Sequence, residues 1–329
     1  MAAVERKRLG PPRIYPYNGG VSVNTRLSES KDFTSTIKSK GVVHEDDPFE
    51  PHSIEVTLNR LVDVAVGKWA YPLSYMFQSL SGGAMVAFGV ILAIAVSTGI
   101  KTPGLANLVS GLVFGFSFVV ILVSNSTLIT SDMAAGFIAL VRGKMRLSSY
   151  IGFVSVGWIG NIVGALVFVG IIAMGPGPYA ALPFLQRAHA LGIAKTGVSA
   201  ESIFTLGIIC TWFLQTALFL YCKARTDVGR MMMAYYGPLA FVAGMTEHCI
   251  ANVGFIALPL MMQDKLAQAM GGSLPLAGPL RAITWGMGPT GFLRNELLAG
   301  AGNLIGGTVF MALVFLAIAR FRRHEAARA

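Results

Sequence analysis

The sequence contains few charged side chains and few cysteines. Only 13% of its 329 residues are Asp, Glu, Lys or Arg, whereas 54% are hydrophobic. Soluble domains carry about 25% charged residues, so the composition excludes an ordinary soluble domain and indicates an integral membrane protein. The three cysteines, Cys210, Cys222 and Cys249, lie in or at the ends of apolar segments without metal-ligand spacing. They predict neither a disulfide framework nor a metal site, and no cofactor is expected.

Long apolar stretches occupy most of the chain after its first 70 or so residues. They cover residues 72–98, 103–124, 128–141, 150–174, 202–221, 232–262 and 296–319. Most exceed the roughly 20 residues that cross about 30 Å of hydrocarbon. Polar residues interrupt 103–141 at SNSTLITSD and 232–262 at TEH, so we interpret each region as one crossing made of two half-helices. The pattern predicts an all-α integral membrane protein with six crossings and both termini on the same side.

Acidic residues are the scarcer charge, 16 against 26 Lys and Arg, and the distribution of the basic ones tests this count. With six crossings, twenty Lys and Arg lie in segments on one side of the membrane and six in the loops on the other. Cytoplasmic loops carry the excess of Lys and Arg, which favours a multi-pass protein of the inner or plasma membrane with cytoplasmic N- and C-termini. The formal charge of +10 then reflects topology, and no nucleic-acid partner is predicted.

The remaining segments divide the chain into four parts. Residues 1–52 are polar and predict a cytoplasmic tail without a secretory signal. Residues 53–70 have apolar side chains at helical spacing after Ser53, a candidate N-cap, and predict an amphipathic interfacial helix. The six-helix domain then covers 71–320, and 321–329 forms a basic cytoplasmic tail.

An internal repeat links two of the predicted crossings. GNIVGALVF at 160–168 recurs as GNLIGGTVF at 302–310. With three crossings in each half, the halves enter the membrane from opposite sides, which is typical of an inverted repeat whose second and fifth helices are broken. The glycines fit close helix packing, and Asn161 and Asn303 fit either hydrogen bonding across that contact or substrate binding.

The stretch MTEHCIANVGF places strongly polar side chains in an otherwise apolar run. Glu247, His248 and Asn252 are the strongly polar residues between 231 and 262. An ionisable residue at membrane depth predicts function, although a buried histidine satisfied by its neighbours is the alternative. Glu247 fits a structural role, accepting backbone N–H groups beside the helix break with Thr246 as a competing cap, or a proton-carrying role. Asn252 fits either orientation of the imidazole or binding of loop carbonyls.

These motifs together resemble the formate/nitrite transporter family. EHCIAN at 247–252 is similar to its Glu-His-Ser/Cys-x-Ala-Asn element, and LITS at 128–131 to its Leu-Phe-Thr-Ser signature. The paired GN elements strengthen the similarity, which runs in order and spacing from about residue 80 to 320. The family implies an aquaporin-like protomer, a homopentamer with one pore in each protomer, and passage of small monovalent anions such as formate, nitrite, hydrosulfide or lactate.

The resemblance also implies roles for individual residues. His248 matches the pore histidine, with Thr130 facing it, unless Thr130 only caps its half-helix. Phe118 and Phe241 match the apolar constrictions, and Lys195 matches a basic residue of the outer vestibule. The implied pore residues are His248, Thr130, Phe118, Phe241, Leu128, Asn252 and Thr211, with Lys195 in the vestibule and Glu247, Asn161 and Asn303 as structural residues beside the pore.

Three positions depart from the family pattern. Thr127 stands where the family usually has Asp or Glu, Ile129 where it has Phe, and Thr211 where Asn is common. These departures remove an acidic group and change the shape beside the pore. They bear on substrate identity more than on fold.

The residues suggest how an anion would pass. A charged anion crossing hydrocarbon costs several kcal/mol even after relaxation, and a phenylalanine constriction does not lower that cost. Its conjugate acid is small and neutral, and His248 is the intramembrane side chain that exchanges protons near neutral pH. We expect proton-coupled anion transport, with the anion, protons and the bilayer as partners; whether His248 or water donates the proton stays open. The alternative is a neutral-solute or regulatory channel on the same scaffold.

Other classes fit less well. A water or glycerol channel would need paired Asn-Pro-Ala elements, and the sequence contains none. An ammonium channel would need two pore histidines, whereas His44, His52, His189 and His324 lie outside the predicted crossings. A membrane enzyme would need a nucleophile with a base, or clustered metal ligands, so no enzyme is predicted.

Overall fold

The computed structural model describes residues 51–175, 177–274, 278 and 280–328. Of the polar tail predicted for 1–52, all but the last two residues lie outside this part. The described residues are helical apart from their connecting turns and one isolated bridge, between Thr284 and Gly291.

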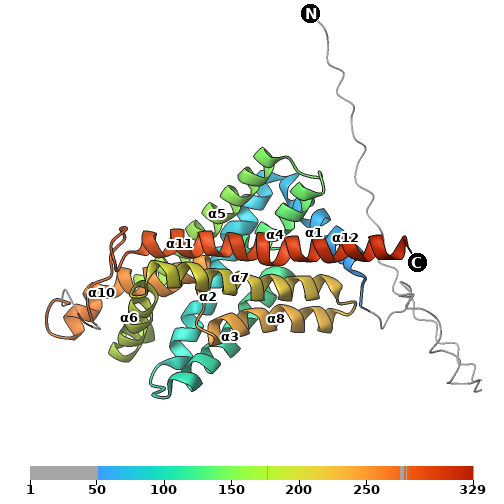
Figure 1. Ribbon diagram of the computed structural model, residues 1–329. Coiled ribbons are helices and arrows are strands. Elements are labelled where there is room, and N and C mark those ends of the chain that lie inside the picture. Colours follow the sequence, from blue (N-terminus) through green and yellow to red (C-terminus); the bar gives the residue numbers. More distant parts are fainter. Residues whose placement is uncertain (1–50, 176, 275–277, 279, 329) are drawn as a thin grey trace, which may run out of the picture. The chain divides into compact units, whose positions relative to one another are not determined.

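The helical segments occur in the following order along the chain. They are α1 Ile54–Trp69, α2 Pro72–Ser97, α3 Pro103–Val123, α4 Ile129–Val141, α5 Leu147–Ala173, η2 Gly177–Ala180, α6 Leu182–Thr196, α7 Ala200–Lys223, α8 Asp227–Ala243, α9 Cys249–Asn252, η3 Val253–Ala257, α10 Leu258–Ala269, α11 Phe292–Ile305, η4 Gly306–Leu313 and α12 Val314–Ala326. Ser53 caps α1 by accepting the Val56 N–H at 3.3 Å. Figure 1 shows α11 and α12 as parts of one long helix that ends near the C-terminus.

Five helical runs in the described part are long and apolar enough to cross a membrane: α2, α3, α5, α7 and the continuous run Phe292–Ala326. α4 is apolar but shorter, with 13 residues. Many large apolar side chains on these helices are exposed, such as Ile159 at 62% and Phe116 at 54%. Exposed apolar side chains at this density suit a hydrocarbon environment, not water.

The chain leaves the helical conformation twice inside the apolar region. The first gap separates α3 from α4 and the second separates α8 from α9. Asn125 and Met245, near the start of each gap, have φ angles of 57° and 55°. This left-handed conformation ends a helix and turns the chain.

Asn161, on α5, fixes the backbone at the first gap through hydrogen bonds of its side-chain amide. Its Oδ1 accepts the N–H of Ile129 at 2.7 Å, and its Nδ2 donates to the carbonyl oxygens of Ser79, at 2.6 Å, and Thr127, at 2.9 Å. The N–H of Thr127 in turn donates to the carbonyl of Gln78 at 3.0 Å. One buried amide therefore joins the end of the gap and the first residue of α4 to α2.

Asn303, on α11, fixes the backbone at the second gap in the same way. Its Oδ1 accepts the N–H of Cys249 at 2.9 Å, and its Nδ2 donates to the carbonyls of Gly207 and Glu247, both at 2.8 Å. The N–H of Glu247 donates to the carbonyl of Leu206 at 3.4 Å. The side chains of both asparagines thus hydrogen-bond to backbone, which fits the packing role.

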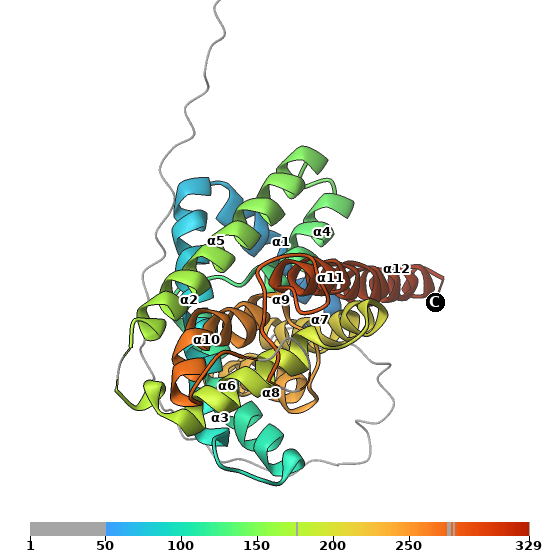
Figure 2. The same cartoon turned by 90° about the vertical axis from the view of Figure 1, so that its left-hand side faces the viewer.

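Glycines of the repeated motif bring the asparagine-bearing helices close to their neighbours. A Cβ atom at Gly164 would overlap the Leu80 carbonyl on α2, and one at Gly306 would overlap the Ile208 carbonyl on α7. α9 lies among α2, α5 and α11 as a result (Figure 2).

Replacement of Asn303 by Leu tests this role. We expect N303L to lower the free energy of unfolding by about 3 kcal/mol, because buried backbone groups at Cys249 and Glu247 would lose their partner. Ala301→Leu, on the exposed side of the same helix, is the control and should change it little. The measurement is chemical unfolding in detergent micelles, and equal stabilities of the two variants would contradict the assignment.

Candidate functional site

The two gaps bring Thr130 and His248 together. The Thr130 hydroxyl and the Nε2 atom of His248 lie 2.9 Å apart, although the residues are 118 positions apart in the chain. Thr130 is fully buried and His248 is 1% exposed. The contact joins the second half of each broken region, since Thr130 lies in the first turn of α4 and His248 immediately precedes α9.

His248 caps α9 with its own ring. The Nδ1 atom accepts the N–H of Ala251 at 3.0 Å. A ring nitrogen that accepts carries no proton, so the neutral ring carries its hydrogen on Nε2 and donates it toward Thr130. The cap expected from Glu247 or Thr246 is therefore wrong, and the Thr130 hydroxyl is not a cap, because α4 has no side-chain cap.

Aromatic and apolar side chains surround this pair. The ring of Phe241 stacks on the imidazole, with centroids 5.0 Å apart and an interplanar angle of 11°. Phe114 meets Phe241 edge to face at 5.6 Å. Phe118 and Leu128, two further residues expected at the pore, are 1% and 3% exposed and belong to the same apolar cluster as Phe241.

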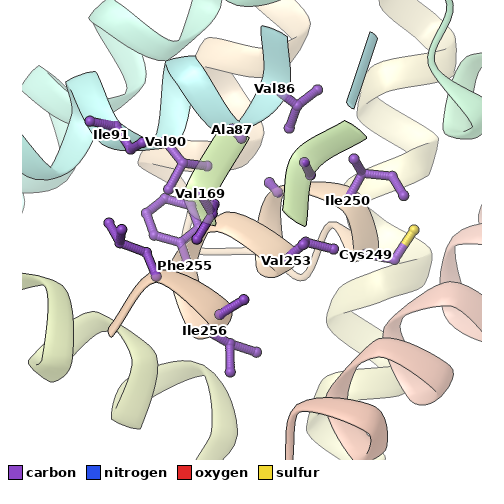
Figure 3. Close-up of a cluster of buried hydrophobic side chains, with 14 of the residues drawn as sticks. Val86, Ala87, Val90, Ile91, Val169, Cys249, Ile250, Val253, Phe255 and Ile256 are labelled. Carbon is purple, nitrogen blue, oxygen red and sulfur yellow. The ribbon is translucent and has the colours of Figure 1, made fainter. Parts of the chain in front are cut away.

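The helical turn after His248 is fixed by apolar packing. Cys249, Ile250 and Val253 belong to one buried cluster with Val90 of α2 and Val169 of α5, and the Cys249 side chain points away from α2 (Figure 3). A close-packed environment of this kind holds the helix start, and with it the imidazole, in one position.

Two cavities flank the contact. One, of about 320 Å³, is lined by His248, Phe241, Lys195 and Glu247 among others. The other, of about 400 Å³, is lined by Lys68, Thr127, Leu128 and further residues. Lys195 lies just before the N-terminus of α7, whereas α1, which carries Lys68, binds the C-terminal end of α7 through Arg60 and the Cys222 carbonyl. Leu206, near the start of α7, lines the first cavity, whereas Leu218 and Cys222, near its end, line the second, so the cavities lie at opposite ends of α7.

Lys195 and Glu247 form an ion pair in the first cavity. Their Nζ and Oε1 atoms lie 3.0 Å apart, and the Lys195 Nζ also donates to the Thr246 carbonyl at 2.6 Å. The other carboxylate oxygen accepts from Asn252 at 2.6 Å and from Asn295 at 3.2 Å. Asn252 thus binds Glu247 and Asn295, and neither the imidazole nor a loop carbonyl.

A second lysine–carboxylate pair lies in the other cavity. Lys68 Nζ lies 2.6 Å from Asp132 Oδ1 and 2.5 Å from the Thr127 hydroxyl. Asp132 Oδ2 accepts from Thr127 at 2.7 Å and from Tyr75 at 3.0 Å. This group was not predicted from the sequence. Asp132 is the sole acidic residue between residues 64 and 200. An isolated acid in so long an apolar region could have identified it as a candidate site residue.

Gln215, one helical turn after Thr211 on α7, was also not predicted. Its Nε2 donates to the carbonyls of Thr130 and Ser131. The Thr211 hydroxyl, the Ser131 hydroxyl and Gln215 Oε1 are buried without a hydrogen-bond partner among the described residues. The side of the Thr130–His248 pair that faces α7 is therefore lined by polar groups.

The described residues contain no group of three or more His, Cys, Asp and Glu side chains placed to hold a metal ion. What the arrangement offers chemically is the imidazole N–H of His248, the Thr130 hydroxyl beside it, and two lysines, each beside a carboxylate.

Asp132→Asn tests the Lys68 pair. We expect D132N to lower the free energy of unfolding by about 2 kcal/mol, because it leaves a mostly buried ammonium without its counter-ion. The double variant K68M/D132N should recover most of that loss, because it removes the unpaired charge as well. Unfolding by denaturant in detergent micelles measures both. A double variant less stable than D132N would contradict the pairing.

Comparison with known proteins agrees with this architecture. The sequence profile described as formate/nitrite transporter matches residues 55–317. The nitrite transporter NirC of Escherichia coli (strain K12) is 25% identical over 243 residues, covering 74% of this chain and 82% of that protein. A probable formate transporter of Methanothermobacter thermautotrophicus is 26% identical over 257 residues, covering 72% and 85%.

Solved structures share the fold. A channel described as an FNT family ion channel superposes with a TM-score of 0.67 at 22% identity, covering 80% of this chain and 98% of that one. A pentameric formate channel with formate bound gives a TM-score of 0.65 at 19% identity, covering 76% and 98%. The prediction of a multi-pass, helical membrane protein is confirmed. Because the matching profile spans well over half of its length, the chain belongs to the formate/nitrite transporter family.

Proposed function

We propose that this chain carries small monovalent anions of the formate and nitrite class across a cell membrane, and that the anion passes the apolar constriction as its neutral conjugate acid. The observation that carries the proposal is the 2.9 Å contact between Thr130 and His248, which lies between two cavities. The names of the relatives, a nitrite transporter and a probable formate transporter, support the anion class.

The proposal includes the finer architecture. α3 with α4, and α8 with α9 to α10, form the second and fifth of six crossings in two inverted repeats, in an aquaporin-like protomer. The matching hydrogen bonds of Asn161 and Asn303, and the matching left-handed residues Asn125 and Met245, support this symmetry. Both termini are cytoplasmic, and α1 lies at the interface between membrane and water. Five copies associate, an assembly supported by the likeness to a formate channel described as pentameric.

Charge explains the order of groups along the path. Lys195 and Lys68 attract an anion into each cavity, while Glu247 and Asp132 keep each lysine from binding it tightly. Phe241, Phe118 and Leu128 then exclude water, and a charged ion there costs several kcal/mol. A carboxylic acid with a pKa near 4 is neutral in only about one molecule per thousand at pH 7, and that fraction is the species that passes.

His248 serves this passage as a hydrogen-bond donor. Its Nδ1 is occupied as the cap of α9, so a second proton on the ring would have to displace the Ala251 N–H. The geometry therefore supports a ring that stays neutral and donates from Nε2 to a substrate oxygen. The proton that neutralises the anion then comes from water in the cavity.

Two substitutions of His248 test the proposal. His248→Phe should lower formate-dependent proton flux into proteoliposomes about 10- to 100-fold, because it removes one hydrogen-bond donor to the passing substrate. His248→Asn should restore most of the flux, because Asn caps helices well and offers an N–H donor without titrating.

Each contrary result removes a different part of the proposal. Full flux in His248→Phe would exclude His248 from the path. His248→Asn as inactive as His248→Phe, while folded, would assign a titrating role to the ring. Flux of a neutral solute without proton movement in the wild-type protein would favour the alternative of a neutral-solute channel.

A further inference from the structure

A basic pocket lies at the far end of α12, apart from both cavities of the path. It has a volume of about 890 Å³ and lies between the end of α4 and one face of η4 and α12. Arg142, Arg320, Arg323 and Arg328 line it, together with His324 and Glu325.

Glu55 of α1 holds two of these arginines in place. Its Oε2 lies 2.9 Å from the Arg142 guanidinium and its Oε1 lies 3.1 Å from that of Arg323. Each guanidinium keeps further N–H donors after this pairing. Four arginines against Glu55 and Glu325 leave the pocket with a net positive charge.

The pocket changes character along the helix. Leu313, Leu316 and Ala317 line its first part, and Arg320, Arg323 and Arg328 its last part. Leu313, Leu316, Arg320 and Arg323 are three or four residues apart, which places them along one side of the helix, and Arg328 follows the end of α12. Val141, from α4, and Phe321 add apolar surface and are 52% and 66% exposed.

The length of this helix places the change at the membrane surface. Phe292–Ala326 has 35 residues. At 1.5 Å per residue such a helix is about 50 Å long, which exceeds the roughly 30 Å of hydrocarbon. The first charged residue after the apolar run is Arg320, and Arg142 ends α4 beside the same pocket.

We propose that this pocket binds an anionic phospholipid, with the headgroup phosphate among Arg142, Arg320 and Arg323 and the acyl chains along Leu313, Leu316 and Phe321. Basic pockets between membrane helices on the cytoplasmic side suit anionic headgroups, and that leaflet carries the negative lipids. The apolar wall distinguishes a lipid from free phosphate, which would gain nothing from it. A lipid bound here bridges the end of α4 and the face of α12, beside the ion pairs that Glu55 makes with both helices.

Arg320→Gln and Arg322→Gln form a matched pair for the test. Both remove one charge from the exposed end of α12, but only Arg320 lines the pocket. The purified full chain, freed of lipid in detergent, is titrated with phosphatidylglycerol or phosphatidylcholine of the same acyl chains, and bound lipid is counted by native mass spectrometry.

We expect tighter binding of phosphatidylglycerol than of phosphatidylcholine by the wild-type protein. R320Q should weaken phosphatidylglycerol binding about fivefold, which corresponds to about 1 kcal/mol per basic side chain, and R322Q should weaken it less than about twofold. Equal binding of the two lipids, or equal losses in R320Q and R322Q, would overturn the proposal. Displacement of the lipid by millimolar inorganic phosphate would also overturn it and leave a site for free anions.

Discussion

Backbone that leaves the helical conformation inside hydrocarbon must find other partners for its N–H and C=O groups, and the rest of this structure depends on how it does so. An unsatisfied backbone group costs several kcal/mol in a bilayer. Asn161 and Asn303 each bind one N–H at the end of a gap, one carbonyl inside that gap and one carbonyl of a neighbouring helix, α2 or α7. Small residues of the repeated motif allow the necessary approach, because a side chain at Gly164 or Gly306 would overlap the neighbouring helix.

The hydrogen bonds that fix the backbone at the two gaps also position the residues of the candidate site. With their backbone fixed, the two regions present Thr130 and His248 to each other, and each places a residue against a lysine–carboxylate pair at its own end of α7. The same ring that faces Thr130 also caps α9, so the fold and the proposed path share one side chain. A substitution of His248 therefore affects both the cap of α9 and the proposed path. A capping residue such as Asn is for this reason a more informative replacement than an apolar one.

The membrane-helical class and the family could be predicted from the sequence, because apolar length, polar interruptions and paired GN motifs are local features that need no knowledge of contacts. The partners of Glu247 could not, since Lys195 and Asn295 are 52 and 48 residues away from it. Lys68 with Asp132, and Gln215 beneath Thr130, were missed for the same reason: they meet across separations of 64 and 85 residues. His248 as a cap was missed because sequence rules assign N-caps to short polar side chains.

The most direct test of the account concerns charge movement. Formate uptake into proteoliposomes is measured while the membrane potential is set by a potassium gradient and an ionophore, at one fixed pH gradient. If the substrate crosses the constriction uncharged, the initial uptake rate stays the same whether the potential is positive, zero or negative inside. A rate that rises and falls with the potential would mean that the anion crosses with its charge, and would contradict the account.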